Sequence, residues 1–167
     1  MIRGAILIGG QSSRFGSPKH LLNIDGESVL ARTTRLLTDA LGEPPLTLGP
    51  NEDLRPGHGP LAGLEAGFLT SDAKHLLVVA CDYPGLTDDV LARLRDAPEA
   101  DVAMPEGHPL VARWHRRTLP AIQTALDEGR RSVMRLLDGL EVVHVDAPKA
   151  ALHNVNTPED LERFRSS

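Results

Sequence analysis

Short runs of apolar residues alternate along this chain with longer segments that have the periodicity of amphipathic helices. Residues 4–8 and 75–80 are the clearest short runs; the first ends at two glycines, and the second is followed closely by Asp82. A strand that is apolar at nearly every position is buried on both faces, as in a parallel sheet covered by helices. The alternation therefore predicts a fold built from β-α-β units, in which ligands bind beyond the carboxyl ends of the strands.

The other segments extend this pattern. Apolar residues spaced by three and four positions predict a helix over 29–41, with Ser28 as its N-cap. Further strands are expected over residues 45–48, 101–104, 110–114 and 140–145. Further helices are expected over residues 59–69, 87–94, 116–128 and 132–137, and from a capped start at 157–160.

The chain has 167 residues without a repeat, a linker or a break in composition, and we expect one domain over residues 1–167. Aromatic residues make up only 3%, and 18 Lys and Arg against 23 Asp and Glu give a net charge of −5. This composition argues against binding to nucleic acid or to an anionic membrane. One cysteine excludes an internal disulfide, and no apolar stretch resembles a signal peptide or a membrane span. We therefore expect a cytoplasmic protein.

The glycine-rich loop after the first predicted strand is the most informative segment of the chain. Gly9 and Gly10 let the backbone approach a ligand and direct N–H groups at it, and Ser12 adds a hydroxyl donor. Arg14 and Lys19 bring two positive charges, and the first 24 residues contain no carboxylate. These features predict a cradle for a polyphosphate. The simpler interpretation is a tight turn with two solvated basic side chains.

Two common phosphate-binding motifs do not fit this loop. A Walker A loop needs a glycine directly before its lysine and a serine or threonine after it, whereas Lys19 lies between Pro18 and His20. A dinucleotide-binding fingerprint needs the spacing G-x-G-x-x-G, which the loop does not have. A polyphosphate cradle here therefore belongs to another class of nucleotide-binding protein.

The same loop resembles the L-A-G-G-x-S-x-R-M-G-x-x-K signature of the MobA-like nucleotidyltransferases, the molybdopterin guanylyltransferases of molybdenum cofactor synthesis. Further segments are similar to motifs of this family and follow the family's order: Gly59-Pro60-Leu61-Ala62-Gly63, Cys81-Asp82-Tyr83-Pro84, His108-Pro109-Leu110, Gly129-Arg130-Arg131-Ser132 and Asn154-Val155-Asn156-Thr157-Pro158-Glu159-Asp160-Leu161. Together the matching segments extend over residues 4–161, nearly the whole chain. The resemblance implies a Rossmann-like, three-layer α/β/α fold, with a mostly parallel sheet between helices on both faces.

The resemblance also implies a reaction, in which the terminal phosphate of molybdopterin attacks the α-phosphorus of GTP, with Mg²⁺, and pyrophosphate leaves. The implied catalytic residues are Arg14, Lys19 and Asp82, and Asp82 is the implied Mg²⁺ ligand. The implied contacts to the nucleotide and its metal are Leu7, Ile8, Gly9, Gly10, Ser12, Lys19, Gly49, Asp53 and Asp82. The implied contacts to the acceptor substrate are Gly59, Gly63, Arg131, Asn154 and Asn156.

Asp82 also fits this chemistry by its position in the sequence. It follows a buried strand, at the sheet edge where the glycine-rich loop is expected, and a carboxylate there can hold Mg²⁺ against triphosphate oxygens. The alternative is an acid that caps the turn before Pro84. A phosphate monoester is already anionic near neutral pH, so the reaction needs positioning and charge neutralisation more than a general base. No histidine is therefore expected to be catalytic, and the seven histidines show no close metal-ligand spacing in the sequence.

Other candidate contacts have structural alternatives. Asn154 and Asn156 alternate on an extended segment, so both amides can line the cleft, or they can shape the turn before the next helix. His108 suits a contact to the pterin or a packing role in its loop. Arg131 suits a contact to the substrate phosphate or a solvated position at a helix end.

Departures from the family pattern bear on the nucleotide. Gly49 stands where the family often has an asparagine that contacts the nucleotide, and a family aspartate maps to Asp53 in a shortened stretch. Gly9 and Gly10 match guanylyl-transferring relatives, whereas cytidylyl-transferring relatives carry A-G there, so guanine is the expected base. Alternatives are a related transferase that uses CTP or a sugar or alcohol phosphate acceptor, and a non-catalytic nucleotide-binding homologue. The resemblance also implies transient contacts with proteins of molybdenum cofactor synthesis or with acceptor proteins.

Overall fold

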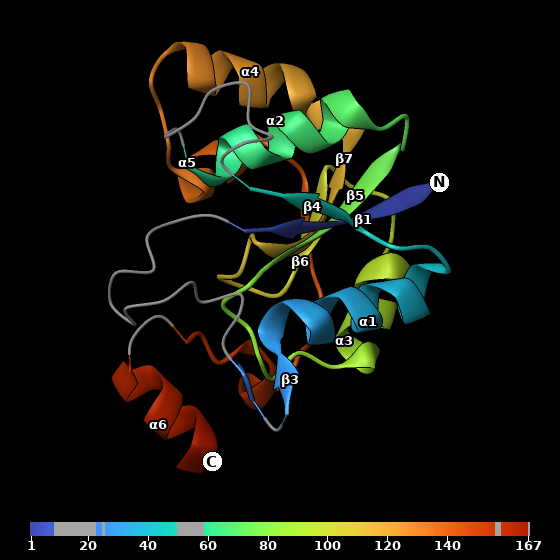
Figure 1. The fold of residues 1–167 in the computed structure, drawn as a ribbon. Coiled ribbons are helices and arrows are strands. Elements are labelled where there is room, and N and C mark those ends of the chain that lie inside the picture. The colour runs from blue at the N-terminus through green and yellow to red at the C-terminus, as the bar shows by residue number, and fades with distance from the viewer. Residues whose placement is uncertain (9–22, 25, 50–58, 156–157, 167) are drawn as a thin grey trace.

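The computed structural model describes residues 1–8, 23–24, 26–49, 59–155 and 158–166. Within these residues, six strands form one sheet in the order β4-β1-β5-β7-β6-β8 (Figure 1). The strands are β1 (Ile2–Leu7), β4 (Leu46–Leu48), β5 (His75–Ala80), β6 (Val102–Met104), β7 (Val111–His115) and β8 (Val142–His144). Pairing is parallel between β4 and β1, β1 and β5, and β6 and β8, whereas β7 runs antiparallel between β5 and β6. The sheet is therefore mostly parallel, as the sequence predicts.

The strand β5 shows why its sequence is apolar throughout. All six of its residues are buried. Leu76 and Val78 belong to the apolar core on one face of the sheet, and Leu77 and Val79 belong to the core on the other face. Side chains alternate along a strand, so a strand with helices on both faces needs an uninterrupted apolar run. The prediction of a doubly buried strand over 75–80 is confirmed.

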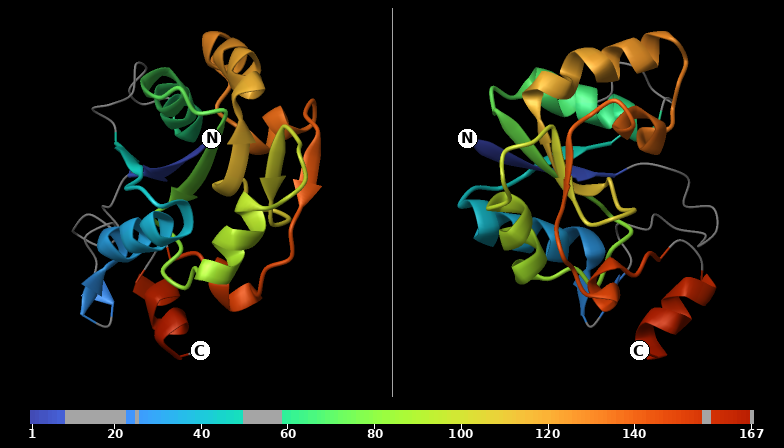
Figure 2. Two further views of the ribbon diagram at one scale, coloured as in Figure 1. Left: turned by 90° about the vertical axis from the view of Figure 1, so that its right-hand side faces the viewer. Right: turned by 180° about the vertical axis from the view of Figure 1, so that it is seen from behind.

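Helices cover both faces of the sheet (Figure 2). One face carries α1 (Val29–Leu41) and α3 (Asp88–Arg95), and the other carries α2 (Pro60–Thr70), α4 (Leu119–Asp127) and α5 (Val133–Leu137). Each face has its own cluster of buried apolar side chains. The predicted three-layer α/β/α arrangement is confirmed.

The predicted capping residues start the helices. The Ser28 hydroxyl accepts a hydrogen bond from the Ala31 N–H at 3.0 Å, and the Ser132 hydroxyl accepts one from the Arg135 N–H at 3.2 Å. Thr87 caps α3 in the same way. These bonds satisfy N–H groups that have no partner inside the helix, which is why serine and threonine favour this position.

Two local details differ from the sequence prediction. The helix expected over 116–128 begins with a 3₁₀ turn, η2 (Arg116–Thr118), and becomes α-helical only at Leu119. Pro120 lies in the first turn of α4, where a residue without an N–H and with a fixed φ suits the start of an α-helix. The turn around Gly26 joins β2 (Asn23–Ile24) and β3 (Glu27–Ser28) in a short hairpin that the sequence analysis did not predict.

The five strands β1, β4, β5, β6 and β8 share one direction, so their carboxyl ends lie at one edge of the sheet. In Figure 1 this edge faces left, with α5 above it and α6 (Pro158–Ser166) below it. After β8 the chain continues through the short turn η3 (Lys149–Leu152) towards α6. Among the helices within the described ranges, none has the length and apolar character needed to cross a membrane.

Candidate functional site

The carboxyl edge of the sheet brings several predicted contact residues together. Leu7 ends β1, Gly49 directly follows β4, and Asp82 lies two residues after β5. The Ile8 N–H donates to the Leu48 carbonyl at 2.7 Å, so Ile8 and Gly49 are neighbours at this edge. The predicted site residues that lie outside the described residues are Gly9, Gly10, Ser12, Arg14, Lys19, Asp53 and Asn156. Their roles stay predictions.

The helix α2 lies very close to the strands beneath it. Its N-cap, Gly59, has a φ of +76°, a conformation that favours glycine. A Cβ at Gly63 would lie 2.8 Å from Leu7 Cδ2, and a Cβ at Gly67 would lie 2.8 Å from Leu76 Cδ1. Gly63 therefore lets the helix approach the last residue of β1. This packing places Gly63 in the core below the edge, and the substrate contact predicted for it stays a prediction.

Asp82 is partly exposed at the carboxyl edge, two residues after a strand that is buried along its whole length. Its backbone carbonyl accepts a hydrogen bond from the Val155 N–H at 2.8 Å, which attaches the C-terminal segment to this residue. Proteins bind Mg²⁺ through oxygen ligands, commonly one or two carboxylates together with substrate phosphates. The Asp82 carboxylate fits this donor chemistry and could hold Mg²⁺, which would supply positive charge to the phosphates of a nucleotide.

Next to Asp82, the side chains of Tyr83, His108 and Asn154 form a connected polar cluster. The Tyr83 Oη lies 3.2 Å from the His108 Nδ1, and the two rings meet edge to face with centroids 5.7 Å apart. Burial raises the pKa of Tyr83; a hydrogen bond from the Asn154 side chain opposes this shift, and the Asp82 charge adds to it. Burial lowers the pKa of His108, which favours the neutral imidazole. This hydrogen-bonded packing of His108 leaves both sequence interpretations open, since a packed ring can also contact a ligand.

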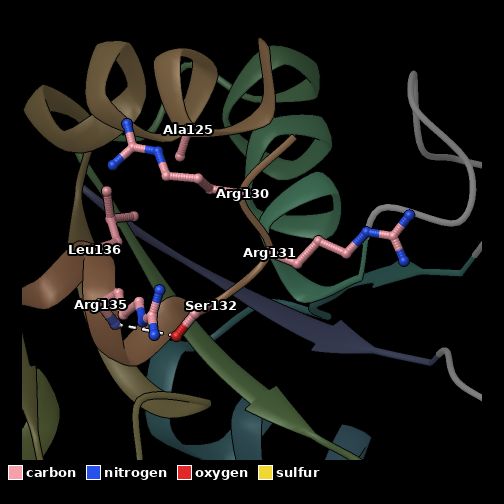
Figure 3. Close-up of a pocket in the computed structure, with 6 residues that line it drawn as sticks. All are labelled: Ala125, Arg130, Arg131, Ser132, Arg135 and Leu136. Atoms are coloured by element: carbon pink, nitrogen blue, oxygen red, sulfur yellow. Dashed lines mark hydrogen bonds between the residues drawn. The ribbon is translucent and has the colours of Figure 1, made fainter. Parts of the chain in front are cut away.

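Arg131 lies exposed between α4 and α5, in a segment with two other arginines. A shallow hollow of about 90 Å³ is lined by Ala125, Arg130, Arg131, Ser132, Arg135 and Leu136 (Figure 3). Arg130 forms an ion pair with Glu128 at 2.8 Å, and Figure 3 shows the Arg131 side chain extending away from Arg130. Within the described part of the chain, Arg131 has no hydrogen bond or ion pair, so its charge is available to a ligand or to water. The hollow is far smaller than the 300–1,000 Å³, roughly, of a pocket for a drug-sized ligand.

A second group of possible metal ligands lies at the opposite edge of the sheet. His75 begins β5 and His115 ends β7, and the antiparallel pairing places them opposite each other. Their Nε2 atoms lie 3.0 and 3.3 Å from the same oxygen of Glu99, and the three possible ligand atoms lie within 4.8 Å of one another. The histidines are far apart in the sequence, so residue spacing could not reveal the group.

The hydrogen bonds of His115 argue against a metal in this group. The His115 Nδ1 accepts a hydrogen bond from the Arg117 N–H at 2.9 Å. A neutral imidazole has one protonated nitrogen, so the proton is on Nε2, which lies 3.3 Å from a Glu99 carboxylate oxygen. A protonated nitrogen has no lone pair for a metal, and Mg²⁺ in addition prefers oxygen ligands. The group is therefore a hydrogen-bonded cluster away from the carboxyl edge.

Solved structures of other proteins share this arrangement of a mostly parallel sheet with helices on both faces. Molybdopterin-guanine dinucleotide biosynthesis protein A from Archaeoglobus fulgidus has a TM-score of 0.74 at 22% identity, covering 99% of this chain and 97% of that one. The 2-C-methyl-D-erythritol 4-phosphate cytidylyltransferase from Thermus thermophilus has a TM-score of 0.72 at 17% identity, covering 99% and 98%. These similarities show the fold.

The family follows from the sequence itself. Residues 4–145 match the family described as MobA-like NTP transferase domain, and the chain belongs to this family of nucleotidyltransferases. It is 33% identical to the molybdenum cofactor guanylyltransferase of Rhodobacter capsulatus, covering 97% of this chain and 94% of that protein. It is 30% identical to the molybdenum cofactor guanylyltransferase of Vibrio cholerae, covering 95% and 89%. The family predicted from the glycine-rich loop and the later motifs is confirmed.

Proposed function

We propose that this protein is a molybdenum cofactor guanylyltransferase, which transfers GMP from GTP to the terminal phosphate of molybdopterin and releases pyrophosphate. The observation that carries the proposal is the place of Asp82, a carboxylate held at the carboxyl edge by the central strand and by the Val155 N–H. The names of relatives that match nearly the whole chain support the same activity. We further propose that residues 1–167 act as one domain and that the protein is cytoplasmic. A chain with a single cysteine forms no internal disulfide, which suits a reducing compartment.

In the proposed reaction, an oxygen of the acceptor phosphate bonds to the α-phosphorus of GTP, and the bond from that phosphorus to the pyrophosphate oxygen breaks. The attacking phosphate is already anionic near neutral pH, so the protein does not have to remove a proton from it. The protein has to align two anionic substrates and neutralise their charges. We assign this role at the triphosphate to Arg14 and Lys19, and we assign to Asp82 the binding of Mg²⁺, which would supply further positive charge to the phosphates.

The first test compares two aspartates. In an assay of pyrophosphate release with GTP, molybdopterin and Mg²⁺, Asp82→Asn should lower turnover by about 10²- to 10³-fold, the usual effect of losing one preorganised electrostatic contact. The matched control is Asp72→Asn, an exposed position between α2 and β5, at the opposite edge of the sheet. This control should keep the turnover of the parent protein. Full Mg²⁺-dependent turnover of the Asp82 variant would contradict the assignment.

The second test concerns the base. Gly9 supplies no side chain at the position where cytidylyl-transferring relatives carry alanine, so a methyl group there would obstruct a purine more than a pyrimidine. In a competition among the four nucleoside triphosphates we expect GTP to be preferred, and Gly9→Ala to shift the preference towards CTP. A preference of the parent protein for CTP would favour the alternative of a cytidylyltransferase. Binding of GTP without any pyrophosphate release would favour a non-catalytic homologue.

A further inference from the structure

The side-chain oxygen of Asn154 is buried, and it finds no hydrogen-bond donor among the described residues. Buried polar atoms in folded proteins nearly always have a partner, so an unpaired one calls for an explanation. The next residue, Val155, donates its N–H to the carbonyl of Asp82 at 2.8 Å. Asn154 therefore directly precedes the residue that is hydrogen-bonded to Asp82, to which we assign the Mg²⁺.

The orientation of the Asn154 amide follows from its contact with Tyr83. The Asn154 side chain forms a hydrogen bond with the Tyr83 hydroxyl. An amide can offer a hydroxyl either its oxygen or its NH₂ group. Because the Asn154 Oδ1 is unpaired, the Nδ2 atom is the one that donates to the Tyr83 Oη. The oxygen is then left for a donor that the described residues do not supply.

The same hydroxyl sets the tautomer of His108. Tyr83 is only 6% exposed, so its hydroxyl proton needs an acceptor inside the protein, and the His108 Nδ1 lies 3.2 Å from the Tyr83 Oη. A neutral imidazole that accepts at Nδ1 carries its own proton on Nε2. The chain of hydrogen bonds therefore runs from the Asn154 Nδ2 through the Tyr83 hydroxyl to the His108 Nδ1. Among the described residues, the Asn154 Oδ1 then has no donor and the His108 Nε2 has no acceptor.

We propose that Tyr83 is a positioning residue, which fixes the hydrogen-bond polarity of Asn154 and His108 so that they recognise a lactam edge of a bound substrate. An oxygen that can only accept does not bind a deprotonated phosphate, whose oxygens are acceptors too. A lactam edge has an N–H next to a carbonyl, which suits one acceptor and one donor. The 2-amino-4-oxopyrimidine ring carries such an edge, and it is shared by guanine and by the pterin. The identity of the substrates rests on the proposed function, whereas the hydrogen-bond chain does not.

The first experiment tests the hydrogen-bond chain without any substrate. Long-range ¹H–¹⁵N NMR spectra of the protein labelled with ¹⁵N-histidine report which ring nitrogen carries the proton, and His108→Gln identifies the signal of His108. We expect the proton on Nε2 in the parent protein. Tyr83→Phe keeps the ring and removes the hydroxyl, and it should reduce this preference. The exposed His144 serves as the control, since its tautomer should not change. A proton on Nδ1, or a tautomer ratio that Tyr83→Phe leaves unchanged, would overturn the proposal.

The second experiment identifies the ring. Guanosine and 6-hydroxymethylpterin, neither of which carries a phosphate, are titrated separately while the His108 signal is followed. We expect one of them to shift this signal, and we expect Tyr83→Phe or Asn154→Leu to weaken that binding by about fivefold to tenfold, the loss of about one hydrogen bond. The compound that shifts the signal assigns the site to the nucleotide or to the acceptor. Inorganic phosphate alone should have no effect, and a shift caused by phosphate but by neither ring would overturn the proposal.

Steady-state kinetics separate this role from the phosphate chemistry. Tyr83→Phe should raise the KM of the substrate whose ring is recognised by about fivefold to tenfold, with a kcat close to that of the parent protein. A loss confined to kcat would contradict a positioning role in binding. If the protein transferred no guanylyl group at all, the proposed function would fail, while the tautomer measurement would still decide the role of Tyr83.

Discussion

Gly85 lies where the C-terminal segment packs against the loop that follows β5, and we predict that Gly85→Ala loosens this contact. A Cβ at position 85 would lie 2.6 Å from the carbonyl oxygen of Ala150 and 3.1 Å from Cε1 of Phe164. Carbon atoms approach carbonyl oxygens to about 3.3 Å in ordinary contacts. The alanine therefore requires a displacement of about 0.7 Å, and a backbone carbonyl cannot yield by rotating a side chain.

The magnitude follows from two opposing terms. Overpacking costs about 1–3 kcal/mol, and a contact with backbone favours the upper half of that range. Gly85 does not have a left-handed φ, so alanine also restricts the unfolded chain, which stabilises the fold by about 0.4–1 kcal/mol. The overpacking term is the larger, and the free energy of unfolding should fall by about 1–2.5 kcal/mol. For a chain of this length the Tm should fall by about 2–10 °C.

The assay is thermal unfolding followed by circular dichroism, with Gly139→Ala as the matched control. Gly139 follows α5, has no left-handed φ, and a Cβ there would meet nothing within 4 Å. The control should keep the Tm of the parent protein or raise it slightly. If Gly85→Ala unfolded at the same temperature as the control, the close approach of the C-terminal segment to the β5 loop would be wrong, and with it the reasoning from the 2.6 Å contact.

Three further predictions concern separate parts of the molecule. Lys19→Ala should weaken the binding of GTP more than that of guanosine in calorimetric titrations, because its charge acts on phosphate; an equal loss for both would indicate a disturbed loop instead. Burial lowers the pKa of His75 and of His115 below the ordinary 6.5. As the pH falls, the histidines of the unfolded chain therefore bind protons before those of the folded protein. The stability that this cluster contributes should be complete above about pH 6.5 and decline below it. Urea unfolding measured from pH 8 to 5 would show this decline, and a free energy of unfolding that does not change with pH would contradict it. Zn²⁺ should not raise the Tm, because the His115 Nε2 carries a proton; a clear rise would refute that tautomer.

The sequence predicts the elements whose signals are local. The apolar run of β5 indicates burial on both faces, and the serine that caps α1 indicates where this helix starts. The apolar pattern of β7 does not predict its direction in the sheet, since a short apolar run is compatible with either direction. The length of the connection determines the direction of β7 relative to β6. A crossover between parallel strands needs a dozen residues or more, and residues 105–110 are too few. The two neighbouring strands therefore have to be antiparallel.

The candidate site is predictable only in part, for the same reason. Asp82 is found from the sequence because its position depends on one strand and the two residues after it. The contact between Tyr83, His108 and Asn154 needs three segments to meet, and no periodicity encodes that meeting. The buried Arg113 gives no sequence signal either, although its guanidinium donates to the carbonyls at the end of α3 and just beyond it, over distances of 2.6–3.2 Å.

We propose that the loop after β5 combines three separable roles within four residues. β5 is buried along its whole length, and residues that directly follow a rigid strand are held more accurately than residues in a free loop. In the proposed roles, Asp82 supplies charge and Tyr83 sets the hydrogen-bond polarity of its neighbours, whereas Gly85 allows the close approach of the C-terminal segment. Because the roles differ physically, their variants should fail differently: the first in turnover, the second in recognition of a ring, and the third in stability. A variant at any one position that changed all three properties together would show that the loop acts only as a structural unit.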